Sequence, residues 1–166
     1  MESANRGTRE IVRWSLSQSQ LSGMNGREFI DFSAKVAATY SDAAACRSAI
    51  SRAYYGEFHV AKSFLDRLGS RPFKNANAHV FVQHRLMSCG HDDAIVAGRL
   101  LQNLFSNRLR ADYDLSLRAV ESVARARAAV EVARRVQGLI EECQQDNEAE
   151  RIKSGIADYE RRISGR

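Results

Sequence analysis

The chain has 166 residues, of which 44% are hydrophobic and 27% are charged, so it is long enough for one domain with a single core. A single proline among many alanines, leucines and arginines argues against a strand-and-turn architecture and favours long helices. No run of about 18 apolar residues is present, which excludes a membrane-spanning helix. The first residues are charged where a signal peptide is apolar, so we expect a cytoplasmic protein without membrane contact.

The charge is positive and is carried mainly by arginine. Twenty-five basic residues stand against 20 acidic ones, giving +5, and only four of the basic residues are lysines. The arginines gather between residues 97 and 136, where eight of them stand among four acidic residues. The planar guanidinium suits bidentate phosphate binding and stacking on bases. This segment indicates either an anionic partner, such as a nucleotide or RNA, or a solvated helix face, and the sequence leaves both open.

The hydrophobic pattern predicts five main helices, and the first two carry clear end signals. The first covers about residues 27–40, where large apolar residues recur at steps of three and four and are expected to form one buried stripe. The members of this stripe are Phe29, Phe32, Val36 and Tyr40. The second helix begins after an N-cap at Ser41 or Asp42 and ends near Leu68, where Gly69 is the stop signal.

Three more helices are predicted in the second half of the chain. They cover residues 78–87, about 94–109, and 116 to about 143. Residues 70–77, which hold the only proline, form a predicted loop. Residues 111–114 interrupt the apolar pattern and are expected to separate the fourth helix from the long, arginine-rich fifth one.

The two ends of the chain are expected to lie outside the main body. Residues 1–25 are predicted to be flexible, or to form a short helix at residues 11–16 with Trp14 docked on the body. Residues 146–166 form a charged tail, predicted to be a weak helix that packs on the body or on a partner. Its apolar stripe consists of Ile152, Ile156 and Tyr159. The fold class is therefore all-α, an up-and-down helical bundle over residues 26–145.

Three cysteines occur at wide spacings, without a CxxC pair. Cys46, Cys89 and Cys143 therefore predict neither a zinc site nor a disulfide framework. Cys46 lies in an alanine-rich stretch and is expected to be a small core residue. Cys89 is close to His91 in a predicted loop, and a Cys–His pairing there is conceivable without a third group to orient it.

No cofactor and no metal are predicted. His79 and His84 are five residues apart and so point about 140° apart on a helix, whereas two helical ligands need a spacing of four. Asp92 and Asp93 are explained more simply as acidic residues at a helix start. The chain also has no phosphate-binding glycine loop, no GxSxG and no HExxH motif.

The predicted second helix carries the first candidate site. Arg52, Tyr55 and His59 lie at positions i, i+3 and i+7 and therefore project from one face. The core is expected to receive Tyr54, Phe58 and Phe64. A guanidinium, a phenol and an imidazole on one face could bind a phosphate and transfer a proton. Alternatively, Arg52 and His59 bind a neighbouring helix end or acidic side chains.

A second cluster of polar residues follows the predicted fourth helix. It consists of Arg108, Arg110, Asp112 and Tyr113. Arginines at a helix C-terminus interact favourably with the helix dipole, which is one sufficient reason for them. Alternatively, Asp112 fixes one arginine through a bidentate bond, and the turn binds an anion.

Together, these two segments resemble the HEPN domain family. Residues 51–59 match the family's S-R-A-Y-Y-x-x-F-H helix, and residues 108–113 match its later R-x-x-A-D-Y motif. His79 also resembles a position that is often histidine in that family. The resemblance covers about residues 27–140, and two motifs at the expected separation make it fairly specific.

The resemblance implies a helical bundle, commonly dimeric, whose two motif-bearing helices face each other across a cleft. It also implies a role in RNA metabolism, in toxin–antitoxin, defence or stress-response systems, in some cases with a nucleotidyltransferase as partner. The family's ribonucleases carry an arginine and a histidine with four to six residues between them and need no metal. Here the corresponding position after Arg108 is Tyr113, whereas Arg52 and His59 on the earlier helix show that spacing, with six residues between them.

Three hypotheses follow. In the preferred one, a homodimer binds a nucleotide or RNA in a cleft formed by the residues of both clusters. In the second, the chain is a metal-independent endoribonuclease with His59 as base and Arg52 or Arg108 as phosphate anchor. In the third, these polar residues only hold helices together in an interaction scaffold.

Overall fold

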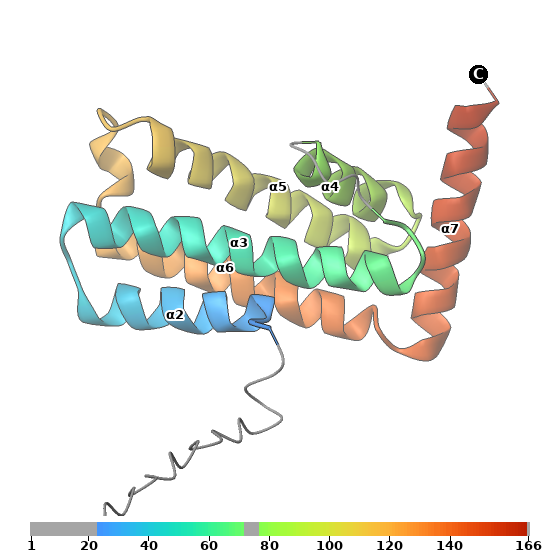
Figure 1. The fold of residues 1–166 in the computed structure, drawn as a ribbon, viewed down its shortest axis with the longest axis horizontal. Coiled ribbons are helices and arrows are strands. Elements are labelled where there is room, and N and C mark those ends of the chain that lie inside the picture. Colours follow the sequence, from blue (N-terminus) through green and yellow to red (C-terminus); the bar gives the residue numbers. More distant parts are fainter. Residues whose placement is uncertain (1–22, 72–76, 166) are drawn as a thin grey trace, which may run out of the picture.

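The computed structural model describes residues 23–71 and 77–165, and in these ranges it is all-helical (Figure 1). The elements are α2 (Gly26–Thr39), α3 (Ala43–Arg67), α4 (Ala78–Ser88), α5 (Asp92–Tyr113), the 3₁₀ helix η1 (Arg118–Val120), α6 (Val123–Glu142) and α7 (Asp146–Ser164). This confirms the predicted up-and-down bundle of five main helices with a helical tail. The predicted helix at residues 11–16, with Trp14, lies outside the described residues.

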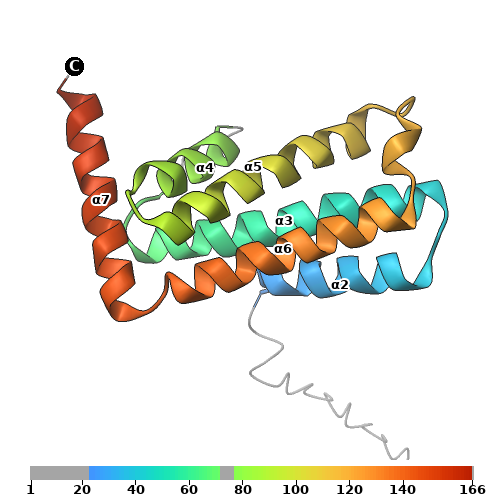
Figure 2. The same ribbon diagram turned by 180° about the vertical axis from the view of Figure 1, so that it is seen from behind.

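Four long helices, α2, α3, α5 and α6, run side by side and form the body of the bundle (Figures 1 and 2). Helix α3 packs against each of the other three, with the fully buried Tyr54 among its core residues. Helix α3 runs antiparallel to α5, because Arg47, near the start of α3, binds carbonyls at the end of α5. Arg27 of α2 likewise pairs with Glu141 at the end of α6, at 2.8 Å. None of the helices described here is long and apolar enough to cross a bilayer.

Local signals set most of the helix ends. The Asp42 carboxylate accepts the N–H of Ala45 at 3.0 Å, which confirms the predicted N-cap of α3. Gly69 follows α3 with φ +85°, a conformation that favours glycine, as the predicted stop signal requires. Asp92 and Asp93 lie in the first turn of α5, as predicted, although the N-cap is His91.

The predicted buried stripe of α2 is wrong in part. Val36 is buried, but Phe32 and Tyr40 are 53% and 56% exposed. The residues that face the bundle are Ile30, Ser33, Val36 and Ala37. The physical reason is the close approach of α2 to α3, where the Ser33 hydroxyl donates to the carbonyl of Ala49 at 2.6 Å. That spacing admits small side chains and leaves the large aromatic ones outside.

The predicted boundary between the fourth and fifth helices is also wrong. Helix α5 continues to Tyr113, so residues 111–113 are helical, and α6 begins at Val123 rather than at Ser116. The buried guanidinium of Arg47 explains the longer helix, because it donates to the carbonyls of Ala111 and Asp114, both at 2.9 Å. The Arg47 side chain also bonds Glu121 and the carbonyl of Leu117, which fixes the segment before α6.

The C-terminal helix α7 stands across one end of the bundle (Figure 1). Ile152 and Ile156 are buried, as the predicted stripe requires, and Arg85 of α4 pairs with Glu160 at 3.0 Å. Gly155 meets the backbone carbonyl of Cys89, and a Cβ at this position would collide with it. Of the two alternatives for the tail, the structure shows packing on the body.

All three cysteines are buried. Cys46 is 1% exposed, which confirms it as a small core residue. Burial raises the thiol pKa of Cys46 and Cys89, and it raises that of Cys143 to about 12. The ring of His91 binds Glu148 and the N–H of Ala94, so the conceivable Cys89–His91 pairing is not formed.

Candidate functional site

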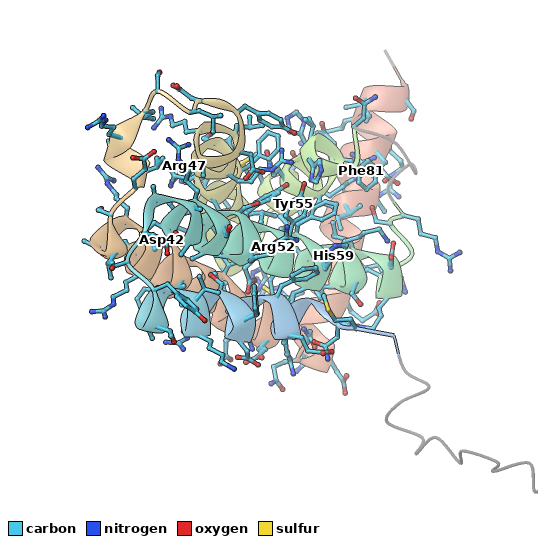
Figure 3. All side chains as sticks on the ribbon, turned by 60° about the vertical axis from the view of Figure 1, so that its left-hand side comes forward. Asp42, Arg47, Arg52, Tyr55, His59 and Phe81 are labelled. Atoms are coloured by element: carbon cyan, nitrogen blue, oxygen red, sulfur yellow. The ribbon has the colours of Figure 1, made fainter. Side chains whose placement is uncertain are left out.

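Arg52, Tyr55 and His59 follow one another along α3, as Figure 3 shows. Arg52 and Tyr55 are half-buried and His59 is exposed. The helix turns its other face to the core, where Tyr54, Phe58 and Phe64 are buried as predicted. The one-face arrangement follows directly from the spacing of these residues in a continuous helix.

The two predicted polar clusters meet where α5 crosses the middle of α3. The Nη2 of Arg108 donates to the hydroxyl of Tyr55 at 2.5 Å and to that of Tyr113 at 3.3 Å. Its guanidinium carbon lies 5.1 Å from the ring centre of Tyr55 and 5.2 Å from that of Tyr113. Arg108 is therefore held between two aromatic faces in a cation–π arrangement.

Asp112 completes the environment of Arg108. Its Oδ2 lies 2.8 Å from the Nε of Arg108 and accepts the hydroxyl of Ser51 at 3.2 Å. Because α5 continues to Tyr113, Asp112 lies one turn beyond Arg108 and can pair with it. Burial opposes the charge of Arg108, but the nearby Tyr55, Asp112 and Tyr113 outweigh it and raise the pKa of the guanidinium. Arg108 is therefore a fixed positive charge.

Arg52 is a cation of a different kind. Its guanidinium carbon lies 5.5 Å from the ring centre of Phe29 and 5.7 Å from that of Tyr55. Within the part of the chain that the structure describes, Arg52 has no ion pair and no hydrogen bond. Its N–H groups are consequently available to an anion from outside.

His59 borders a hollow of about 360 Å³ between α2 and α3. The lining residues are Met24, Asn25, Gly26, Phe29, His59, Lys62, Ser63 and Asp66. The imidazole stacks on Phe29, with ring centres 6.0 Å apart and planes 12° apart. Burial and the nearby ammonium of Lys62 lower its pKa, so His59 is neutral at pH 7. A neutral imidazole can accept a proton or stack on a planar ligand.

His79 of α4 is a neighbour that the sequence-based site omitted. Its Nδ1 lies 2.5 Å from the hydroxyl of Tyr54, and its ring centre lies 4.3 Å from that of Phe58. Burial and the charges of Arg108 and His59 lower its pKa. Burial also raises the pKa of Tyr54, so the phenol keeps its proton, and its hydroxyl shares a hydrogen bond with Nδ1 of His79. The only signal in the sequence was the match of His79 to the family position.

Arg110 does not belong to this group. Its side chain is exposed and borders a different cavity, together with Arg125 of α6. The other six predicted ligand-binding residues lie along the α3–α5 face, but His59 and Arg108 share no hydrogen bond in the described ranges. Tyr55, Arg52 and Phe29 lie between them. We call the face formed by Phe29, Arg52, Tyr55, His59, Arg108 and Tyr113 the arginine–aromatic face.

The arrangement suits the binding of an anion with a planar group rather than a metal ion. Arginines provide N–H donors for a phosphate, and exposed ring faces provide stacking surfaces. In residues 23–71 and 77–165, no three His, Cys, Asp or Glu side chains are grouped so that they could hold a metal ion.

Comparisons of the chain with protein-family models, with curated proteins and with solved structures gave no match.

Proposed function

We propose that this chain is a HEPN-like domain that binds a nucleotide or single-stranded RNA on the arginine–aromatic face. The observation that carries the proposal is the state of Arg52, a half-buried cation that contacts two aromatic rings and no carboxylate in the described residues. Arg108 and Lys62 already have acidic partners, at 2.8 Å and 2.7 Å. Arg52 is thus the side chain on this face that gains most from a bound phosphate.

Arg108 supports Arg52 by its position. Both guanidinium carbons lie within 5.7 Å of the ring centre of Tyr55, one from α3 and one from α5. A phosphate bound at Arg52 therefore also lies in the field of Arg108, whose orientation is fixed by Asp112 and Tyr55. A fixed charge needs no reorganisation when the ligand arrives, which favours binding.

The rest of the face fits a base. Phe29 presents its ring between Arg52 and His59, and the hollow beside it is about 360 Å³ in volume. Stacking of a base on an aromatic side chain contributes about 1–3 kcal/mol and tolerates any sequence. The proposed ligand thus places a phosphate at Arg52 and a base at Phe29 and His59.

The HEPN resemblance extends the proposal to partners. By that resemblance, the chain acts in the cytoplasm as a homodimer within a toxin–antitoxin, defence or stress-response system, with a nucleotidyltransferase-type protein as partner. These features rest on the motifs at residues 51–59 and 108–113 alone. Co-purification with the products of neighbouring genes and sedimentation of the free chain test them.

Binding of a fluorescein-labelled ten-nucleotide RNA, followed by anisotropy, tests the main proposal. Arg52→Ala is expected to weaken binding by about tenfold or more, because charge-assisted hydrogen bonds to phosphate are lost. The matched control is Arg134→Ala, an exposed arginine of α6 that lies outside the arginine–aromatic face. Equal affinities of wild type and Arg52→Ala would contradict the proposal. Titration with AMP and ATP distinguishes nucleotide from RNA.

A second candidate function is metal-independent RNA cleavage, which the two neutral imidazoles near Arg52 and Arg108 favour. In this reaction His59 takes the proton of a ribose 2′-hydroxyl, whose oxygen attacks the phosphorus. The bond to the 5′-oxygen then breaks, that oxygen receives a proton from water, and a 2′,3′-cyclic phosphate remains. Cleavage of RNA in EDTA that disappears in His59→Ala supports it, and intact RNA with wild type counts against it.

A further inference from the structure

A second cavity, of about 400 Å³, lies between the end of α5, the segment before α6, and α6 itself. It is lined by Ile50, Asn107, Arg110, Asp114, Leu117, Ala119, Val120, Arg125 and Ala129. None of these residues belongs to the arginine–aromatic face. The volume falls within the range of about 300–1,000 Å³ that is typical of small-molecule sites.

The inner wall of this cavity is apolar. Ile50, Val120 and Ala129 are 2%, 7% and 5% exposed and belong to the hydrophobic core. Leu117 is half-buried beside them. Apolar surface of this kind favours a ligand that brings apolar surface of its own, because burying it removes both from water.

The rim is cationic. Arg110 and Arg125 both border the cavity, and across the described ranges neither side chain has an ion pair or a hydrogen bond. Asp114, the acidic residue of the lining, is already engaged: its Oδ1 accepts the hydroxyl and the N–H of Ser116, at 2.7 Å and 3.2 Å. Glu121 nearby is bound by Arg47. Neither acidic group forms an ion pair with Arg110 or Arg125 in the described ranges, and two arginines face the single carboxylate of Asp114, so both guanidinium groups are open to an external anion.

We propose that this cavity binds a small amphiphilic anion, a carboxylate or phosphate head on an apolar body. The head is bound by Arg110 and Arg125, and the body lies on Ile50, Val120 and Ala129. Both parts are needed: an inorganic anion leaves the apolar wall in water, and an amphiphilic cation meets two like charges. The site is independent of RNA binding, because the two faces share no residue.

Isothermal titration of the full chain with octanoate and with octyl phosphate tests this inference and compares the two head groups. Binding of either octyl anion is expected, whereas inorganic phosphate and octylamine are expected not to bind. Arg125→Gln is expected to weaken binding by about tenfold, since it removes a charge-assisted contact. Arg127→Gln, an exposed arginine of the same helix that does not line the cavity, is the matched control and is expected to bind as wild type.

Three results would overturn the proposal: no binding of either octyl anion, unchanged binding by both Arg110→Gln and Arg125→Gln, or equal binding of octylamine. Circular dichroism shows whether each variant is folded, and substitution of these exposed arginines leaves the core intact. Anisotropy with RNA separates the two sites. Arg125→Gln is expected to retain RNA binding, and Arg52→Ala is expected to retain octanoate binding, so either proposal can fail without the other.

Discussion

Arg47 and Arg52 lie five residues apart on α3 and have opposite environments. Arg47 is 8% exposed and donates to Glu121 and to four backbone carbonyls at the end of α5 and in the segment before α6. Arg52 has cation–π contacts with the rings of Phe29 and Tyr55, and no ion pair or hydrogen bond among the residues described. The first arginine is a structural clamp, whereas the second is the one that we propose binds phosphate.

This difference predicts opposite stability effects. Arg47→Ala is expected to lower the free energy of unfolding by about 3–5 kcal/mol, since it leaves Glu121 and buried carbonyls without a partner. Arg52→Ala is expected to cost at most about 1 kcal/mol, the size of a partly exposed cation–π contact. Urea denaturation measures both, and equal losses would contradict the assignment of the two roles.

Glu57 is the least expected buried residue of α3. It is 0% exposed, and neither of its carboxyl oxygens has a hydrogen-bond partner among the residues that the structure describes. Burial and the nearby Glu141 raise its pKa from 4.5 to about 8, against a smaller opposing effect of Arg27. At neutral pH, Glu57 is therefore protonated in the folded protein and ionised in the unfolded chain.

The sign of the resulting pH dependence is fixed. Between about pH 5 and pH 8 the folded state holds the Glu57 proton more tightly, so the free energy of unfolding falls as pH rises, by up to about 1.4 kcal/mol per pH unit. Glu57→Gln removes this contribution. Thermal melts at several pH values are expected to show that the stability of the variant relative to wild type increases toward pH 8.

The lowered pKa values of His59 and His79 make the free energy of unfolding rise with pH around pH 6.5, which is the opposite direction. Wild type and Glu57→Gln share this effect, so it cancels when their stabilities are compared. Glu150→Gln, which alters an exposed glutamate, is the control. Parallel stability curves for wild type and Glu57→Gln would contradict the raised pKa.

At the scale of elements, α2 and α3 approach so closely that glycine is required on both. A Cβ at Gly56 would lie 2.5 Å from the Cγ1 of Ile30 and 2.9 Å from the carbonyl oxygen of Gly26. A Cβ at Gly138 of α6 meets nothing within 4 Å. The two glycines therefore differ in whether a methyl group fits.

Gly56→Ala is expected to destabilise the protein by about 1–3 kcal/mol, because α2 must move away from α3. Gly138→Ala is the matched control and is expected to stabilise by about 0.5–1 kcal/mol, since alanine is the better helix former. Chemical denaturation of both variants measures the difference. A stabilising Gly56→Ala would show that α2 and α3 do not pack as described.

Signals within a few residues made several helix ends predictable. The cap at Asp42 and the stop at Gly69 are examples. The end of α5 was not predictable in this way, because it depends on Arg47, more than 60 residues away in the chain. The buried side of α2 depends on Gly56 of a different helix.

In the candidate site, too, features set by nearby residues were predictable and features set by the packing of distant helices were not. The one-face pattern of α3 gave Arg52, Tyr55 and His59, whereas the contact between Arg108 and Tyr55 arises only from packing. Because α5 was predicted to end near residue 109, one signal for separating Arg108 from Arg110 was missed. Residues two apart on a helix point about 200° apart, so Arg108 and Arg110 cannot share a face once the helix continues past them.

For the whole molecule, the positive charge is expected to make RNA binding dependent on salt. Each phosphate contact on a single strand contributes about 0.7 to the slope of log affinity against log salt concentration. Arg52→Ala is expected to reduce the magnitude of this slope by about 0.7, because one contact is lost. Anisotropy titrations at several salt concentrations measure it, with Arg134→Ala as the unchanged control. Identical slopes would mean that Arg52 does not contact phosphate.

The burial of Tyr54 has a consequence for the stability of the fold at alkaline pH. Tyr54 is fully buried at the centre of the bundle, and its pKa is raised above the ordinary value of 10. Unfolded chains ionise this phenol more readily, so stability declines as pH climbs past 10. In strong base, the phenolate absorbance of this tyrosine will therefore appear together with the unfolding of the bundle.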